Sequence, residues 1–312
     1  MTGKRLLLHS VFLFLLPLLV AWLGISLAGA LAMVLVALLW RWAITISGIV
    51  SPASVPALEL ETISASHFVE KVRWSMDRLG VEYTEKPVGG TLGIFYAGRT
   101  VPQLKIHTGM TRSVIGDSPA ILRYLWGAYH AELGENAAFL EPTEERLGLE
   151  KKLDRYGYNL QVWVYYHILQ DRELTLHAWG ANDPQLPPWQ RTALSVLFPI
   201  QRALIRMAFR ISDTHYAGAV EHIEILLADM DRRLADGRAS ILGGDHIDFV
   251  DIAFAAFSGL WLLPDNYGGG KADGVRIELV RCPSRMQQDS ERWRGKYPHV
   301  VTFIECLYER ER

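Results

Sequence analysis

Residues 58–80 read LELETISASHFVEKVRWSMDRLG, and this stretch decides the fold. Its first six residues alternate between apolar and polar side chains, which is typical of a half-buried strand. Apolar residues then recur at helical spacing, at Val69, Val72, Met76 and Leu79. Gly80 ends this predicted helix, because glycine adopts the left-handed conformation of a helix C-terminus at little cost.

Short elements continue in a fixed order after Gly80. A second strand is predicted at 81–83 and a third at 101–106, with Pro102 at its start. Residues 114–125 read VIGDSPAILRYL, and they predict a strand followed by a helix that starts at Asp117 and Ser118. The resulting order is β-α-β, a connector, and β-β-α, which we assign to a domain spanning 57–128.

Three signatures in this order resemble the thioredoxin-like N-terminal domain of the cytosolic glutathione transferase superfamily. The first is Ser66, which stands five residues before a Lys-Val pair inside the helix. The second is Val101-Pro102, similar to the cis-proline of the family. The third is the run DSPAILRYL at 117–125, similar to the acid-Ser-x-Ala-Ile run of the family. The resemblance implies an α+β fold, in which this domain is followed by an all-helical bundle at 137–312.

The resemblance implies that Ser66 is the catalytic residue of a serine-type site. A free thiol has a pKa near about 8.5, and glutathione transfer needs the thiolate. A hydroxyl donor and a helix N-terminus both favour that charged form. The alternative is that Ser66 only caps the helix. Ser64 is the rival catalytic position if the turn is one register longer.

The tripeptide itself is expected to bind to Val101, Pro102, Asp117 and Ser118. In the family the residue before the cis-proline pairs its main chain with the cysteinyl part, and the residues in the positions of Asp117 and Ser118 hold the γ-glutamyl group. A helix N-terminus is also a ready site for a carboxylate. One departure lies just before Val101, where family members often have lysine and this chain has Thr100. The contact to the glycyl carboxylate is therefore not predicted.

The second half of the chain predicts helices at 147–170, 191–211, 217–234 and 298–308, while 262–294 has no clear period. Asp248 and Asp251 have the spacing of a capping box, similar to the box in the family's helical domain. The pocket for the second substrate is expected between the two domains, beside the aromatic segment 163–166. A row of basic residues recurs at every fourth position, at Arg202, Arg206 and Arg210. This row is either solvated or directed at anionic lipid headgroups.

Residues 6–40 contain no Asp, Glu, Lys or Arg, and this run is too long for one membrane span. A break near Gly24 predicts a transmembrane helical hairpin of 6–23 and 27 to about 46, so residues 1–50 form a membrane anchor. Lys4, Arg5 and Arg41 then lie on the cytoplasmic side, together with the enzyme domain. The alternative is a secretory signal cleaved after the small residues 28–30, which leaves an apolar new terminus.

Composition excludes several other classes of protein. The formal net charge is −2, so nothing in the charge favours nucleic acid. Two cysteines without a Cys-x-x-Cys pair argue against a disulfide scaffold or a zinc ribbon. The ten histidines show no ligand spacing, and no metal site is predicted.

Two functions remain. The leading hypothesis is a membrane-anchored transferase that uses glutathione as co-substrate to conjugate or isomerise an apolar electrophile. The alternative is a non-catalytic scaffold or membrane-complex subunit with the same fold. A thiol-disulfide reductase is disfavoured, because Ser66 and Val69 stand where cysteines are needed. Members of the family usually dimerise, so a homodimer is an expectation of the resemblance alone.

Overall fold

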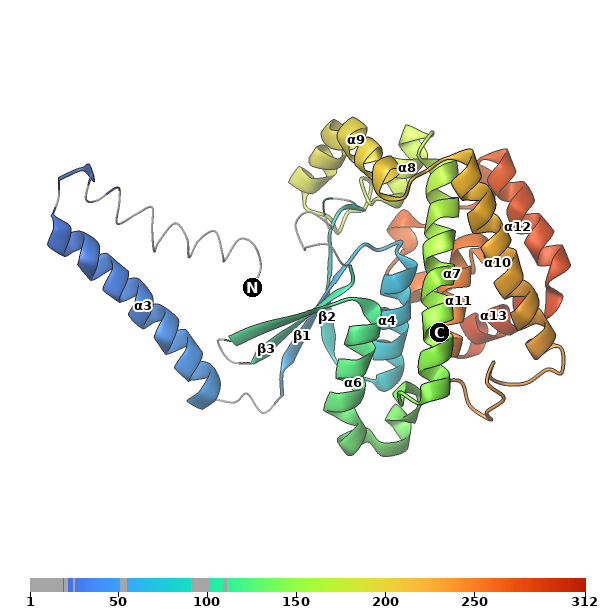
Figure 1. The fold of residues 1–312 in the computed structure, drawn as a ribbon, viewed down its shortest axis with the longest axis horizontal. Helices are drawn as coiled ribbons and strands as arrows, with labels where there is room; N and C mark the ends of the chain where they lie inside the picture. The colour runs from blue at the N-terminus through green and yellow to red at the C-terminus, as the bar shows by residue number, and fades with distance from the viewer. Residues whose placement is uncertain are drawn as a thin grey trace.

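The computed structural model describes most of the chain, and Figure 1 shows how its elements are arranged. The described residues are 19, 22–24, 26–50, 55–90, 92, 101–108 and 111–312. A small sheet lies to one side of a larger group of helices, and α4 (His67–Leu79) and α6 (Ser118–Leu133) lie between them (Figure 1).

The sheet has four strands in the order β2-β1-β3-β4. They are β1 (Ala57–Thr62), β2 (Tyr83–Pro87), β3 (Gln103–Thr108) and β4 (Thr111–Gly116). β1 pairs with β2 in parallel and with β3 antiparallel, and β3 pairs with β4 antiparallel. The predicted strand order along the chain is therefore confirmed.

Two helices complete this half of the molecule. α4 (His67–Leu79) and α6 (Ser118–Leu133) pack against each other, and α6 also contacts β3 and β4. α4 ends where the sequence predicts, because Gly80 has a φ of 71° and its N–H bonds the carbonyl of Asp77.

The second half is a bundle of helices. Its long members are α7 (Glu144–Ile168), α9 (Pro188–Ala208), α10 (Asp213–Leu234), α11 (Phe249–Leu262), α12 (Ser284–Lys296) and α13 (Pro298–Arg310). α11 is the central helix, since all of its residues but Leu260 are buried and it contacts both α4 and α7. The Asp248–Asp251 capping box is present at its start, as predicted.

Two features of this half differ from the expectation. A short helix, α8 (Arg172–Ala178), was not predicted. It follows α7 after a tight turn, and the side chain of Asp171 caps its N-terminus. The segment 262–294 is not without structure: it forms three 3₁₀ turns and then α12. The sequence of α12 shows no clear helical period because most of its residues are polar or charged. Only a few apolar side chains, such as Met286 and Trp293, pack against the core.

Buried charges join the two halves. The ammonium of Lys71 on α4 is fully buried and lies 2.8 Å from Glu150 on α7. Glu70, also fully buried, pairs with Arg312 at 2.7 Å. The His67 ring bonds the carbonyl of Gly157 at 3.0 Å. Because each of these α4 side chains has its partner in the bundle, the two halves form one packed unit.

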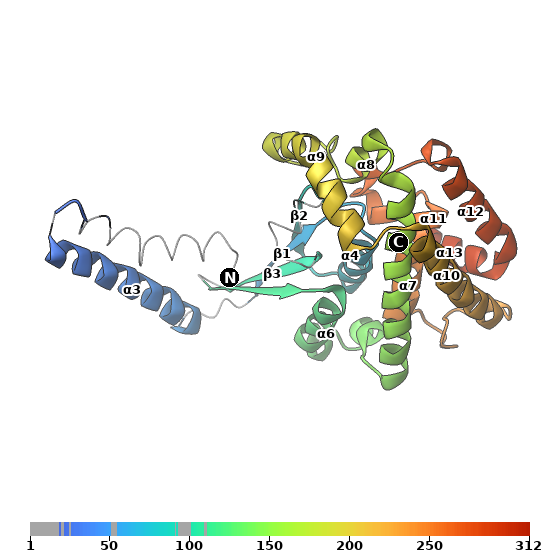
Figure 2. The same cartoon turned by 45° about the horizontal axis from the view of Figure 1, so that its top comes forward.

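α3 (Leu27–Val50) projects away from the sheet in Figures 1 and 2. It corresponds to the second arm of the predicted hairpin, whereas most of the first arm, 6–23, lies outside the described residues. Within the part of the chain that is described, no single helix is long and apolar enough to cross a membrane. By length and composition, only α9 and α10 taken together, bent by 62°, meet that requirement.

Candidate functional site

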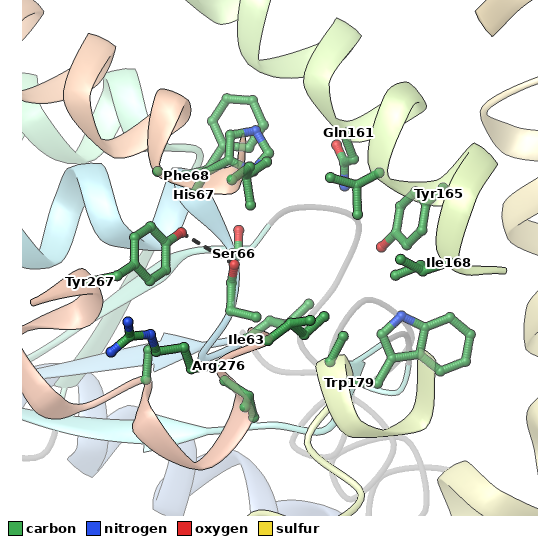
Figure 3. A pocket seen from close by; sticks show the side chains of 18 of the residues that line it. Ile63, Ser66, His67, Phe68, Gln161, Tyr165, Ile168, Trp179, Tyr267 and Arg276 are labelled. Carbon is green, nitrogen blue, oxygen red and sulfur yellow. Dashed lines mark hydrogen bonds between the residues drawn. The ribbon is translucent and has the colours of Figure 1, made fainter. Parts of the chain in front are cut away.

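A cavity of about 350 Å³ lies between the sheet half and the helical bundle. One wall is made by the loop before α4 and by the starts of β3 and α6, and the other by α7, α8 and the segment after α11. Figure 3 shows the side chains that face it. Ten of its lining residues are Ile63, Ser66, Phe68, Val101, Asp117, Gln161, Tyr165, Trp179, Tyr267 and Arg276.

Ser66 lies at the N-terminus of α4 and lines this cavity. It has the extended backbone of an N-cap, with φ −73° and ψ 127°, but its side chain makes no capping hydrogen bond. Its carbonyl accepts the first bond of the helix, from Glu70 N at 2.9 Å. Ser64, the rival position, is buried and does not line the cavity. The half-buried hydroxyl of Ser66 is therefore the one that the cavity offers to a ligand.

Val101 also lines the cavity, and the peptide bond between Val101 and Pro102 is cis, as predicted. Pro102 is buried directly before β3. Thr100, where the sequence departs from the family pattern, lies outside the described residues.

The start of α6 supplies a second group of polar atoms. Asp117 lines the cavity with an exposed side chain and a φ of 74°, and it makes no side-chain capping bond. This left-handed backbone is unusual for a residue with a side chain and marks a locally constrained position. Ser118 is fully buried and does not line the cavity, and its hydroxyl has no hydrogen-bond partner in the described structure. An orphaned buried hydroxyl beside a helix N-terminus indicates a place for an acceptor.

The opposite wall is mostly apolar, apart from three neighbouring side chains that carry polar groups. Gln161, Tyr165 and Trp179 lie together on the far side of the cavity from Ser66 (Figure 3). Burial raises the pKa of Tyr165, and this outweighs the opposite effect of its polar contacts with Gln161 and Trp179. The phenol is thus neutral at physiological pH and able to donate a hydrogen bond.

The predicted aromatic segment only partly lines the cavity. Val164 and Tyr165 face it, but Trp163 turns into the bundle, where its indole N–H donates to Asp289 at 2.9 Å. This division follows from the helical period, since consecutive residues of α7 point about 100° apart.

The segment after α11 contributes lining residues that sequence reasoning missed. Tyr267 closes one side, with its hydroxyl donating to the Ala65 carbonyl at 3.3 Å (Figure 3). Arg276 and Cys282 lie further along. No periodicity marks these residues, because they belong to irregular turns, and only the tertiary fold brings them beside Ser66.

Two further lining residues, Cys282 and His67, are not in a reactive protonation state. Burial raises the pKa of the Cys282 thiol to about 11, so it is not a thiolate at neutral pH. Burial lowers the pKa of His67 to about 3 despite its bond to Gly157, so this ring stays neutral. Any thiolate in the cavity has to come from a ligand. Among the described residues no group of His, Cys, Asp or Glu could hold a metal ion.

Comparisons with known proteins support the fold. No protein-family model matches the chain, and no curated protein does. A glutathione transferase structure from Phanerochaete chrysosporium is 17% identical, covers 83% of this chain and 98% of that chain, and has a TM-score of 0.50. A glutathione S-transferase from Methylobacterium radiotolerans in complex with glutathione sulfonate is 16% identical, over 81% and 91% of the chains, with a TM-score of 0.48. The chain thus has a glutathione transferase-like fold.

Proposed function

We propose that this protein is a glutathione-dependent transferase that conjugates or isomerises an apolar electrophile. The observation that carries the proposal is the cavity itself. Ser66, Val101 and Asp117 come from separate segments and share one wall, opposite a largely apolar one. The fold likeness to a glutathione transferase agrees with this assignment.

Each polar group has a place in such a reaction. The hydroxyl of Ser66 would donate to the sulfur of glutathione, and the N-terminus of α4 would favour its thiolate. Val101 would pair its main chain with the cysteinyl unit. Asp117 would meet the γ-glutamyl ammonium, while the Ser118 hydroxyl and the N-terminus of α6 would hold the carboxylate. The apolar wall would take the electrophile.

The anchor forms the second part of the proposal. We assign residues 1–50 to a membrane anchor, 57–128 to the glutathione-binding domain and 137–312 to the helical domain, with both domains on the cytoplasmic side. The support is that α3 exposes large apolar side chains along its length. They include Leu27, Leu31, Leu35, Leu39, Trp40 and Trp42. Such a surface is costly in water and favourable in lipid.

Calorimetry with glutathione tests the first part. Wild-type protein is expected to bind it, and Ser118→Ala to bind it roughly 10- to 100-fold more weakly, as for a lost hydrogen bond to a charged group. Ser290→Ala is the matched control, because Ser290 is also fully buried with an unpartnered hydroxyl, but lies on α12. If wild-type protein binds no glutathione, the scaffold hypothesis replaces the enzyme.

Fractionation tests the anchor. Full-length protein should sediment with membranes and resist carbonate extraction. A full-length protein that stays in solution without detergent would contradict the hairpin.

A further inference from the structure

α9 has two apolar faces, and within the described residues one of them is buried against α8. The inner face carries Leu194, Phe198 and Ile205, which are buried in a small cluster with α8. This cluster is separate from the main core. Both views of the ribbon place α9 at the outer edge of the molecule, beside α8 (Figures 1 and 2).

The outer face is apolar as well. Its large side chains are exposed to 54% at Trp189, 69% at Val196, 61% at Ile200 and 69% at Met207. The spacings between them are seven, four and seven residues, so they form one stripe along the helix. Val196 and Ile200 each stand two residues from buried Phe198, about 200° around the helix. The stripe therefore points directly away from the protein.

Three arginines lie between the inner face and the stripe or just past the helix: Arg202 stands about 40° and Arg206 about 80° around the helix from Phe198, and Arg210 follows its last residue, Ala208. Arg202, Arg206 and Arg210 follow one another every fourth residue, and residues 188–211 contain no Asp or Glu. None of the three forms an ion pair with a carboxylate in the described part of the chain. Arg202 bonds the side-chain oxygen of Gln170, while Arg206 and Arg210 extend into solvent.

The neighbouring helix shows that this is not a general property of the surface. α10 exposes one large apolar side chain, Ile225, to 62%. Its arginines Arg232 and Arg233 are both paired with Asp229 at 3.1 Å. A helix in water ordinarily has this character, with isolated apolar residues and neutralised charges. α9 combines an apolar stripe with arginines that form no ion pair in the described part of the chain, and Arg206 shares a surface pocket with Asp171, Glu173 and Asp213.

We propose that α9 lies in the plane of an anionic lipid surface, with its stripe among the acyl chains and its arginines on the headgroup phosphates. An amphipathic helix with tryptophan and aliphatic residues on one face and basic residues beside them has the chemistry for this position. Each arginine near an anionic surface contributes about 1 kcal/mol of attraction. A protein partner would need acidic groups in register with every fourth residue, whereas a lipid surface offers phosphates everywhere.

The position of α9 connects this surface to the cavity. Phe198 on its inner face packs against Trp179, with ring centroids 5.7 Å apart, and Trp179 lines the cavity. One layer of side chains therefore separates the lipid-binding helix from the cavity. If the proposed transferase function holds, this arrangement brings the electrophile pocket to the bilayer, where apolar molecules partition.

An environment-sensitive dye on the full-length chain tests the proposal. Val196→Cys carries the dye on the stripe, and Ile225→Cys, equally exposed on α10, is the matched control. Both variants also carry Cys306→Ser, while Cys282 is buried. The protein is incorporated into phosphatidylcholine vesicles with or without about a third of phosphatidylserine. Dye at Val196 is expected to shift to the blue and to be quenched by spin-labelled lipid only with phosphatidylserine, and dye at Ile225 to remain in water.

The arginines are tested in the same assay. Arg206→Gln with Arg210→Gln should reduce the shift at Val196 by more than half, whereas Arg232→Gln with Arg233→Gln should leave it unchanged. The readout requires no glutathione, so it is independent of the transferase assay. An equal shift in both kinds of vesicle would disprove the role of anionic lipid, and no shift in either would disprove docking. A shift without vesicles that grows with protein concentration would instead identify a second copy of the chain as the occupant.

Discussion

The start of α11 in the helical half and the starts of α4 and α6 in the sheet half are built differently. At α11 the side chain of Asp248 accepts from Val250 N at 2.8 Å, and Asp251 accepts from both Asp248 N and Ile241 N at 2.8 Å. At α4 and α6 the cap residues Ser66 and Asp117 make no such bond. The saturated helix start lies in the core, and the open ones face the cavity. An open helix start that faces a cavity leaves its polar groups available to a ligand, whereas a saturated start does not.

Removing the saturated cap should have the largest effect. Asp251→Ala leaves the N–H groups of Ile241 and Asp248 buried without acceptors, at a cost of about 1–3 kcal/mol each. We expect the free energy of unfolding, measured by urea denaturation, to fall by roughly 2–6 kcal/mol. Asp251→Asn keeps one acceptor oxygen and should lose about half as much. A loss below about 1 kcal/mol would show that this start is as dispensable as an uncapped one.

Removing the hydroxyl of Ser66 should affect catalysis and not stability. If it aims at the glutathione sulfur, Ser66→Ala should lower turnover by roughly 10²–10³, as for the loss of one well-placed donor. The affinity for glutathione should remain nearly unchanged. Turnover with a generic aromatic electrophile, at saturating glutathione, is the measurement. Ser64→Ala is the control for the rival position and should remain active.

The stability of the Ser66→Ala variant tests whether the start of α4 depends on a side-chain cap. Ser66→Ala should leave the free energy of unfolding unchanged within a few tenths of a kcal/mol, because no capping bond is lost. Ser212 caps α10 and accepts from His215 N at 3.2 Å, so Ser212→Ala should cost about 1 kcal/mol. If the Ser66 variant is the less stable one and keeps its activity, Ser66 is a structural cap.

The saturated start of α11 should also make the stability of the protein depend on pH. Burial and the neighbouring Asp248 carboxylate raise the pKa of Asp251 to about 7, against 3.8 for an ordinary aspartate. Between those values the folded state holds a proton that the unfolded chain has released. The proton on Asp251 therefore stabilises the folded state. This contribution to the free energy of unfolding is complete below about pH 4 and is lost as the pH rises through 7.

Asp248→Asn should flatten this slope, because it removes the neighbouring charge. The difference in free energy of unfolding between pH 4.5 and 7.5 should shrink by about 1 kcal/mol relative to wild type. Asp289 does not interfere in this range: burial would raise its pKa, but bonds from His167, Tyr216 and Trp163 lower it to about 2. An unchanged slope in the variant would mean that Asp248 does not control the Asp251 proton.

Local patterns were sufficient to predict the order of elements in the sheet half and the end of α4, whereas the second strand forms at Tyr83–Pro87 and not at 81–83. Alternation around Leu60, the spacing of Val69 and Val72, and the stop at Gly80 all act within a few residues. The capping box at Asp248 is equally local. These features could be read from the sequence because their physical causes lie in adjacent residues.

The site could be predicted on one wall and, on the other wall, only at the aromatic segment of α7, where Tyr165 faces the cavity. Ser66, Val101 and Asp117 belong to motifs, whereas Trp179, Tyr267 and Arg276 enter the cavity from segments without periodicity. Whether the Ser66 hydroxyl caps α4 was also undecidable, because both roles need the same residue at the same position. The orientation of the hydroxyl depends on packing between the two halves, which no local pattern encodes.

The buried charges between the two halves have a consequence for synthesis on the ribosome. Glu150, the partner of Lys71, comes 79 residues later, about 4–16 s at ordinary elongation rates. Arg312, the partner of Glu70, comes 242 residues later, about 12–48 s. Before Glu150 is translated, Lys71 has neither of its carboxylate partners, Glu150 and Asp154, whereas Glu70 already has Arg73 at 3.0 Å on the same helix. The first half of a nascent chain therefore stays water-accessible along this helix until the bundle has been translated, so a ribosome stalled before Glu150 would present an unfinished domain to chaperones.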